Sequence, residues 1–357
     1  MKRTLTPDDI EAAVYGGAIL GGGGGGFIEP GLRTARLALQ VGSPQLWSVD
    51  EFDEDVLSAT VALVGAPAAP NALVQPAHLI RALDLLQSQL PGGRVAAINT
   101  NENGAETTVN GWFHSALTGV PVIDLACNGR AHPSSVMGSM GLHLDPDYTS
   151  IQAYAGGHPE FYVEGVTKGR MEATSSVVRR ASVEADGWVG VARNPVSVGY
   201  AASNGAAGAI SFAIELGRVF LDGGVQAVTE RLGGRIIASG TVGSYSCEPV
   251  EGLDIGKVVL TDAAATTLLF VNEYMVAEHD GERVGAFPDL IMTFDENGVP
   301  LPSARVQPGQ TISVLVAPAS SLKLASTMFM ADLYEPLEKA LGVQFAPRSG
   351  VLAGAPA

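Results

Sequence analysis

Six consecutive glycines, Gly21 to Gly26, constrain the fold of this chain more than any other stretch of its sequence. Glycine has no side chain to pack and loses the most backbone entropy on folding, so an ordered run needs a local reason. One reason is a loop whose bare N–H groups hold an anion or a carbonyl oxygen close to the backbone. The alternatives are a flexible loop and a close helix–helix crossover.

The residues around the glycines predict helices on both sides. Thr6 is a typical N-cap, Pro7 suits the first helical position, and Ile10 and Val14 continue a helical period. Residues 29–39 again have a helical pattern. A dinucleotide-binding fingerprint needs a strand before its glycines, and a Walker A loop needs Gly-Lys-Ser/Thr after them, so the order found here disfavours a nucleotide-dependent oxidoreductase and excludes a P-loop.

Composition and charge limit the classes of partner. The chain has 357 residues, of which 46% are hydrophobic and only 16% charged, so we expect two domains and a homo-oligomer that buries an apolar face. A net charge of −16 argues against nucleic acid and anionic membranes as partners. Two cysteines are too few for a disulfide framework. The N-terminus does not have the pattern of a signal peptide, and we expect a cytoplasmic protein.

The first two-thirds of the chain alternates between strand and helix patterns. Strands are expected at 56–65, 95–98 and 120–125, and helices at 77–90 and 106–117. This alternation predicts an α/β fold: a Rossmann-like, three-layer domain with a parallel or mixed sheet.

The rest of the chain predicts a change of architecture. Strands are expected within 175–200, including Ser182 to Asp186, and helices at 206–221 and 225–232. After Gly234, apolar runs separated by turns predict a second, β-rich domain, with Asp280-Gly281 and Asn297-Gly298 as hairpin signals. Helix is expected again over 320–341. We therefore expect an α/β domain at 1–232, a β-rich domain at 233–318, a C-terminal helical segment at 319–346 and a loose tail at 347–357.

Two polar loops follow predicted strands of the first domain. The first carries Asn101 and Glu102 and suits a ligand-binding loop with a general base, or an ordinary helix-capping loop. The second places Asp124, Cys127, Asn128, Arg130 and His132 within ten residues. Asp124 and Arg130 could instead pair to hold this loop, and we find no activating partner for Cys127 as a nucleophile.

A third polar cluster lies in the β-rich domain. Asn272 and Glu273 follow an apolar run, and His279 comes shortly after. These residues could bind a divalent metal, but their spacing matches no standard signature, and surface turns are the alternative. We expect Asn272 and Glu273 to approach a cleft formed by Glu102, the second loop and the glycine run, where Gly22, Gly23, Gly24 and Gly25 would bind the substrate.

An ordered set of short motifs resembles the S-methyl-thiohydantoin desulfurase family. These motifs are Gly17-Ala18-Ile19-Leu20 with the glycine run, Gly65-Ala66-Pro67, Glu102-Asn103-Gly104, Val122-Ile123-Asp124 with Gly129-Arg130-Ala131 and Pro133, Asn272-Glu273, and Pro288-Asp289-Leu290-Ile291. The resemblance covers residues from about 5 to about 318. Some members of the family are fused to hydantoinase- or oxoprolinase-like subunits.

The resemblance implies a Rossmann-like part, a β-rich part and hydrolysis of a cyclic thiohydantoin, in which water replaces a sulfur substituent at an sp² ring carbon. Glu102 or Asp124 would be the base, and His132 would protonate the leaving group. Asn101, Asn128, Arg130, Asn272 and Glu273 would bind substrate. The sequence departs from the family at Ala126, where a second acid is common. No cofactor is certain, although a divalent metal could replace the base. The alternative is a non-catalytic ligand-binding subunit or a partner of a hydantoinase-type enzyme.

Overall fold

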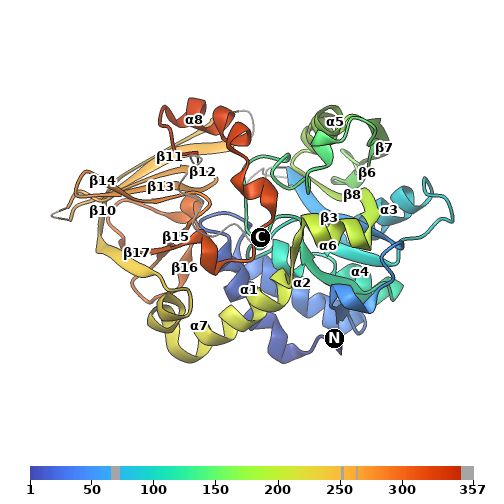
Figure 1. Ribbon diagram of the computed structural model, residues 1–357, viewed down its shortest axis with the longest axis horizontal. Helices are drawn as coiled ribbons and strands as arrows, with labels where there is room; N and C mark the ends of the chain where they lie inside the picture. The colour runs from blue at the N-terminus through green and yellow to red at the C-terminus, as the bar shows by residue number, and fades with distance from the viewer. Residues whose placement is uncertain (66–72, 251–252, 263, 347–357) are drawn as a thin grey trace.

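The chain folds around two β-sheets, as the computed structural model shows (Figure 1). The structure describes residues 1–65, 73–250, 253–262 and 264–346. The predicted tail at 347–357 and the residues Ala66 and Pro67 lie outside the described residues. The eight α-helices of the described part are α1 (Pro7–Leu20), α2 (Ile28–Val41), α3 (Pro76–Gln87), α4 (Trp112–Thr118), α5 (Met171–Glu184), α6 (Val198–Asn204), α7 (Ala209–Arg231) and α8 (Glu335–Leu341).

The first sheet is mixed, with a parallel centre. Its order is β1-β2-β5-β4-β3-β8-β6-β7, and β9 pairs with β5. Strands β2, β5, β4 and β3 run parallel, and the other pairs are antiparallel. The strands are β1 (Lys2–Thr4), β2 (Gln45–Trp47), β3 (Leu57–Gly65), β4 (Ala97–Thr100), β5 (Val122–Ala126), β6 (Ser150–Gly156), β7 (Val163–Gly169), β8 (Trp188–Ser197) and β9 (Ala206–Ala207).

The side chains of β3 point alternately to the two faces of this sheet, and helices pack against both faces. Ala59 and Val61 pack with Leu83 of α3, whereas Ala62, on the opposite face, packs with Val178 of α5. Successive side chains of a strand point to opposite faces, so one strand contributes to both cores. The three-layer α/β architecture with a mixed sheet is confirmed.

The second sheet is antiparallel throughout, which confirms the predicted β-rich part. Its order is β14-β13-β12-β11-β10-β17-β15-β16. The strands are β10 (Arg235–Val250), β11 (Leu253–Leu260), β12 (Thr267–Val271), β13 (Glu273–His279), β14 (Glu282–Ala286), β15 (Leu290–Phe294), β16 (Pro300–Leu301) and β17 (Thr311–Ala317). As predicted, Asp280 and Gly281 form a two-residue hairpin turn, with φ angles of 53° and 75°.

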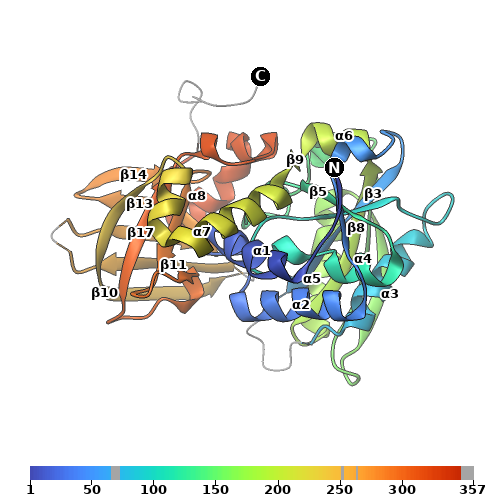
Figure 2. The same cartoon turned by 90° about the horizontal axis from the view of Figure 1, so that it is seen from below.

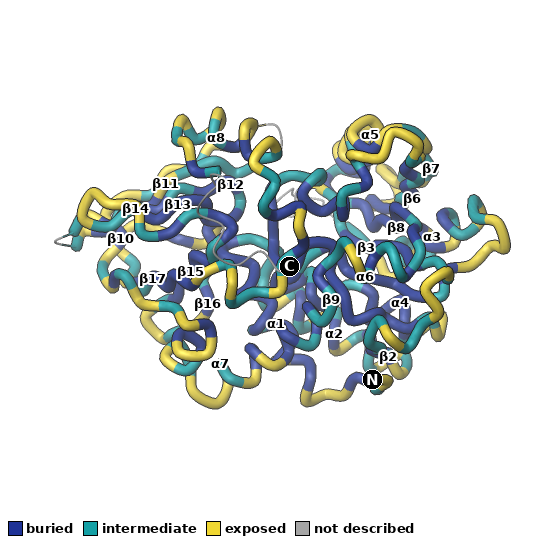
Figure 3. The backbone as a smooth tube through the Cα atoms, viewed as in Figure 1, coloured by how far each residue is buried: buried dark blue, intermediate teal, exposed yellow. Residues whose placement is uncertain are grey.

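Helices α1 and α7 lie side by side between the two sheets (Figure 2). Their backbones come so close that a Cβ atom on Gly16 would lie 1.8 Å from the carbonyl oxygen of Ala213. A Cβ on Gly217 would lie equally close to the oxygen of Ala12. The buried backbone is concentrated around this crossing and in the sheets, as Figure 3 shows. The crossing therefore sets the position of the glycine run that follows α1.

Several predicted elements differ from the structure. Residues 182–186 were expected as a strand, but α5 extends through Glu184, and its buried positions Met171, Thr174 and Val178 have helical spacing. The helix expected over 106–117 is a 3-10 turn followed by the short α4, because Gly111 between them has a φ of 89°.

The other two differences are breaks within predicted helices. The two helices predicted before Gly234 form one element that is kinked at Gly224, whose φ of 62° and ψ of −156° are not helical. Residues 320–341 contain 3-10 turns before the short α8.

Candidate functional site

The six glycines, here called the glycine loop, form an ordered connection between α1 and α2. The backbone oxygen of Gly22 accepts a hydrogen bond from the N–H of Tyr274 in the second sheet, at 2.9 Å. The oxygen of Gly25 accepts one from the N–H of Glu106, after β4 of the first sheet, at 3.0 Å. The loop is therefore bonded to both halves of the molecule rather than free.

Two glycines of the loop leave room for charged side chains. A Cβ on Gly22, where φ is 57°, would lie 2.0 Å from Nη2 of Arg130. A Cβ on Gly24 would lie 2.0 Å from Oε1 of Glu273. Because Gly22 and Gly24 have no side chain, a guanidinium and a carboxyl group can lie directly against the backbone.

Glu102 and His132 are two residues of the predicted site that lie in direct contact. Glu102 follows β4 and His132 follows β5, and these strands are parallel neighbours, so both loops leave the same edge of the sheet. Oε2 of Glu102 lies 2.6 Å from Nδ1 of His132, although the direction of the N–H bond is not that of an aligned hydrogen bond. The two side chains are 13% and 2% exposed, so the pair is largely shielded from water.

Asn101 connects the Glu102–His132 contact to Arg193. Its Nδ2 atom donates to Oε2 of Glu102 at 3.3 Å, and its Oδ1 accepts from Nη2 of Arg193 at 2.9 Å. Gly138 packs against His132, because a Cβ atom on Gly138 would lie 2.5 Å from Nε2 of His132. That Nε2 atom is buried and has no hydrogen-bond partner in the described part of the chain.

Arg130 is fully buried and only partly paired. Its Nη1 donates to the backbone oxygens of Pro288 and Asp289, at 3.2 and 2.6 Å, and its guanidinium lies 4.8 Å from the ring centre of Phe287. Nε and Nη2 have no partner among the described residues. Burial lowers the pKa of Arg130 to about 10, against the opposite effect of Glu273. Arg130 therefore remains a cation at neutral pH with donors to spare.

Glu273 brings a carboxyl group from the second sheet to the same place. It begins β13, is 3% exposed, and its Oε2 atom has no partner within the described ranges. Burial, and then the charge of Glu102, raise the pKa of Glu273 well above its ordinary value, while Arg130 acts in the opposite direction. These interactions place Glu102, Arg130 and Glu273 in one electrostatic cluster.

Asp124 is a further predicted site residue that lies near the start of α7. Oδ1 of Asp124 accepts from the N–H groups of Ile210 and Ser211, at 3.0 and 2.9 Å, so it caps the N-terminus of α7. The alternative pairing of Asp124 with Arg130 is therefore not the arrangement found, and the cap gives this carboxylate a role other than that of a base.

Two of the three predicted asparagines, Asn128 and Asn272, lie in tight surroundings. Asn272 has a φ of 57°, and its Oδ1 accepts from the N–H of Asp254 at 2.9 Å. Asn128 is fully buried, its Nδ2 lies 3.4 Å from Sδ of Met328, and its Oδ1 has no partner among the described residues. Asn272 thus stabilises a turn, whereas Asn128 keeps an unused acceptor.

Arg193 was not among the predicted site residues, whereas Cys127 was considered as a nucleophile without an activating partner. Arg193 lies in β8 directly after an apolar run. The appearance of a charged side chain at that point was the only local feature of the sequence that singled it out. Cys127 is buried and lies 3.2 Å from both Oγ1 of Thr60 and Nδ2 of Asn99. Burial raises the pKa of this thiol, which favours the protonated, unreactive form.

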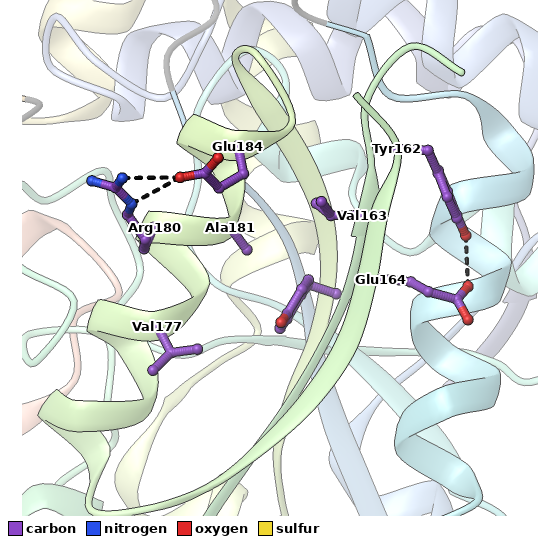
Figure 4. A pocket seen from close by; sticks show the side chains of 8 residues that line it. Tyr162, Val163, Glu164, Val177, Arg180, Ala181 and Glu184 are labelled. Atoms are coloured by element: carbon purple, nitrogen blue, oxygen red, sulfur yellow. Dashed lines mark hydrogen bonds and ion pairs between the residues drawn. The ribbon is translucent and has the colours of Figure 1, made fainter. Parts of the chain in front are cut away.

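Other features of the described residues lie outside this cluster. No group of three or more His, Cys, Asp or Glu side chains in the described ranges is arranged to hold a metal ion. None of the helices that the structure describes is long and apolar enough to cross a membrane. A groove of about 570 Å³ lies between α5 and strands β6 and β7 (Figure 4), and none of the predicted site residues lines it.

Comparisons with known proteins identify the family. Residues 8–158 match the model of the S-Me-THD-like N-terminal domain, and residues 170–327 match that of the S-Me-THD-like C-terminal domain. No curated protein matches the chain. An X-ray crystal structure of a protein from Chromobacterium violaceum has the same fold, with a TM-score of 0.71, 22% identity and 99% of each chain covered. Since the two family models together span most of its length, this chain belongs to the S-Me-THD-like family.

Proposed function

We propose that this protein is a hydrolase that replaces the sulfur substituent of an S-alkylated, thiohydantoin-type ring by oxygen. Membership of the S-Me-THD-like family supports the substrate class. The observation that carries the reaction type is the buried contact of 2.6 Å between Glu102 and His132. A carboxylate that holds one nitrogen of an imidazole leaves the other nitrogen available to accept and return a proton.

In the proposed mechanism, the carboxylate of Glu102 lies against Nδ1 of His132 and stabilises the imidazolium that forms when Nε2 takes a proton from the attacking water. The water oxygen bonds to the sp² ring carbon that carries sulfur, and the C=N electron pair moves to the ring nitrogen, which takes a proton from neutral Glu273. The oxygen of the tetrahedral intermediate then forms the C=O bond and returns its proton to Glu273, while the C–S bond breaks and the thiolate leaves with the proton held by His132. The products are a thiol and a ring with a new carbonyl group.

Arg130 and Glu273 supply the polar surroundings of the ring in this proposal. The unpaired Nε and Nη2 donors of Arg130 suit the negative charge that develops on the ring during water attack. The unpaired Oε2 of Glu273 suits a ring N–H, or donates a proton when Glu273 is neutral. Both side chains lie against the glycine loop, so a ring bound between them would also meet the backbone of that loop.

The direct test is turnover by the purified protein. It is incubated, with and without divalent metal, with S-methyl-thiohydantoins, thiohydantoins and hydantoins, and thiol release and ring absorbance are followed. We expect thiol release from the S-methyl compounds, and its loss in the Glu102→Gln variant. Tight binding without turnover across the whole panel would instead favour a ligand-binding subunit that works with a hydantoinase-type enzyme.

A further inference from the structure

A row of buried polar side chains crosses the first sheet next to the candidate site. Gln152 of β6 pairs in register with Arg193 of β8, Arg193 with Thr60 of β3, and Thr60 with Asn99 of β4. All four side chains are buried, in strands whose neighbours form apolar cores. Buried polar groups destabilise a fold unless they are paired, so the partners of each side chain in this row matter.

The side chain of Arg193 extends beyond this row and contacts Asn101. Its Nη2 donates to Oδ1 of Asn101 at 2.9 Å, between two buried groups. Asn101 in turn donates through Nδ2 to Oε2 of Glu102, which lies against His132. A continuous series of contacts therefore runs from the middle of the sheet to the proposed acid–base pair.

The chemistry of these groups gives the amide one favourable orientation. A guanidinium has only donors, and an ionised carboxylate has only acceptors. An amide between them must turn its oxygen to Arg193 and its NH₂ group to Glu102. Without Arg193 the amide oxygen of Asn101 loses its donor, and only the hydrogen bond to Glu102 holds the side chain in place.

We propose that Arg193 is a positioning residue that fixes the Asn101 amide and thereby holds Glu102 against His132. The part of this inference that concerns turnover rests on the proposed function. The part that concerns the orientation of Asn101 and His132 does not, because it can be measured without substrate.

Three substitutions separate this role from a merely structural one. Arg193→Lys keeps a donor-only cation, whereas Arg193→Met removes every donor and keeps much of the side-chain length. Thr60→Val is the matched control, because it removes a hydroxyl from the same buried row at a position that contacts neither Asn101 nor Glu102. Circular dichroism and thermal melting check that each variant is folded.

The first readout is NMR of protein labelled with ¹⁵N at histidine and asparagine. Long-range ¹H–¹⁵N spectra report which nitrogen of His132 carries the proton, and the amide signals of Asn101 report its environment. We expect both to change in Arg193→Met and to stay as in the wild type in Arg193→Lys and Thr60→Val. Unchanged spectra in folded Arg193→Met, or equal changes in Thr60→Val, would overturn the proposal. If Arg193→Met does not fold, Asn101→Ala tests the same link, because it removes the amide that lies between Arg193 and Glu102. A changed His132 signal in Asn101→Ala then supports the proposal, and an unchanged signal overturns it.

The second readout is kinetic. Misplacement of a catalytic group by about 1 Å lowers the rate by about 10²-fold, so we expect kcat of Arg193→Met to fall by about that factor, with a smaller change in KM. Arg193→Lys should recover most of this loss. A wild-type kcat in Arg193→Met would contradict the proposal. Absence of turnover in the wild-type protein would instead contradict the proposed function and leave the NMR outcome to decide the role of Arg193.

Discussion

Oε2 of Glu102 lies 2.6 Å from Nδ1 of His132, and this contact joins the ends of two neighbouring parallel strands. Neither residue is on a strand or helix, so their meeting depends on the register of β4 with β5 and on the loops that follow them. Such loops at the carboxyl edge of an α/β sheet are where ligands commonly bind. The contact between Glu102 and His132 is the basis of the first prediction.

Glu102→Gln should nearly abolish turnover while the fold is kept. The amide has the shape of the carboxyl group but cannot hold an imidazolium, so kcat should fall by about 10²–10⁴-fold with a smaller effect on KM. Thiol release under saturating substrate measures the change. Combined with His132→Gln, the loss should be much smaller than the product of the two single losses, because the residues act as a unit. Multiplicative losses would show that they act separately.

Asp124 should matter for stability more than for turnover. Asp124→Ala removes two hydrogen bonds from a charged acceptor at the start of α7, which should lower the free energy of unfolding by about 1–3 kcal/mol. Asp124→Asn keeps an acceptor and should lose less. Urea unfolding and kcat are measured on the same samples. A fall in kcat by about 10²-fold in a stable Asp124→Asn variant would return Asp124 to the role of base.

Gly22 should not tolerate a side chain. Gly22→Ala places a methyl group 2.0 Å from Nη2 of Arg130 at a φ of 57°, so strain and overpacking add up to roughly 3 kcal/mol or more. Gly92→Ala is the control, since Gly92 also has a positive φ but has open space around its Cβ position. That variant should lose about 1–2 kcal/mol. Equal losses in the two variants, measured by urea unfolding, would mean that the contact with Arg130 is unimportant.

Glu273 should make stability depend on pH. Burial raises its pKa in the folded state well above the ordinary value of 4.5, so between these two values the folded protein keeps a proton that the unfolded chain has released. Stability should therefore fall as pH rises from about 4.5 towards the folded-state pKa, with a slope of up to about 1.4 kcal/mol per pH unit from this group.

Glu273→Gln has no proton to lose at this position, so its stability relative to the wild type should rise with pH over the same window. Urea unfolding between about pH 4.5 and pH 8 measures the difference. Glu282→Gln, at an exposed position in the hairpin of β13 and β14, is the matched control for the loss of one carboxyl group. A difference from the wild type in Glu273→Gln that varies with pH no more than that of Glu282→Gln would contradict the prediction.

Assembly is a separate expectation that follows from composition. With 46% hydrophobic and 16% charged residues, we expect a homo-oligomer. Light scattering at micromolar concentration should give a multiple of the chain mass of 36.8 kDa. A mass near that of one chain would contradict this prediction.

Local signals were sufficient wherever the determining contacts are themselves local. Thr6 begins α1 as expected, and its backbone N–H donates to Oδ2 of Asp9 only three residues later, at 2.9 Å. The turn at Asp280 and Gly281 likewise depends on two residues that accept positive φ. Elements of this kind could be predicted from the sequence without knowledge of the rest of the fold.

Contacts between distant segments were not predictable in the same way. Asp124 has the position of a catalytic carboxylate in sequence, but its partners are backbone N–H groups of α7, which only the folded chain brings to it. Helix α5 was missed because Val183 and its neighbours alternate like a strand, whereas the buried Thr174 and Ala181 give a weak apolar stripe. Packing against the sheet decided the outcome there.

The bonding of the glycine loop to both sheets has a consequence for how this architecture can be divided. The family models meet near β7, within the first sheet, and the change of sheet comes later, at α7. Both borders leave the loop on the side of Glu106, to which Gly25 is bonded, and separate it in sequence from Tyr274, to which Gly22 is bonded. A chimaera that exchanges the second sheet between relatives would therefore have to keep the backbone of residues 21–26 bonded to both halves at once.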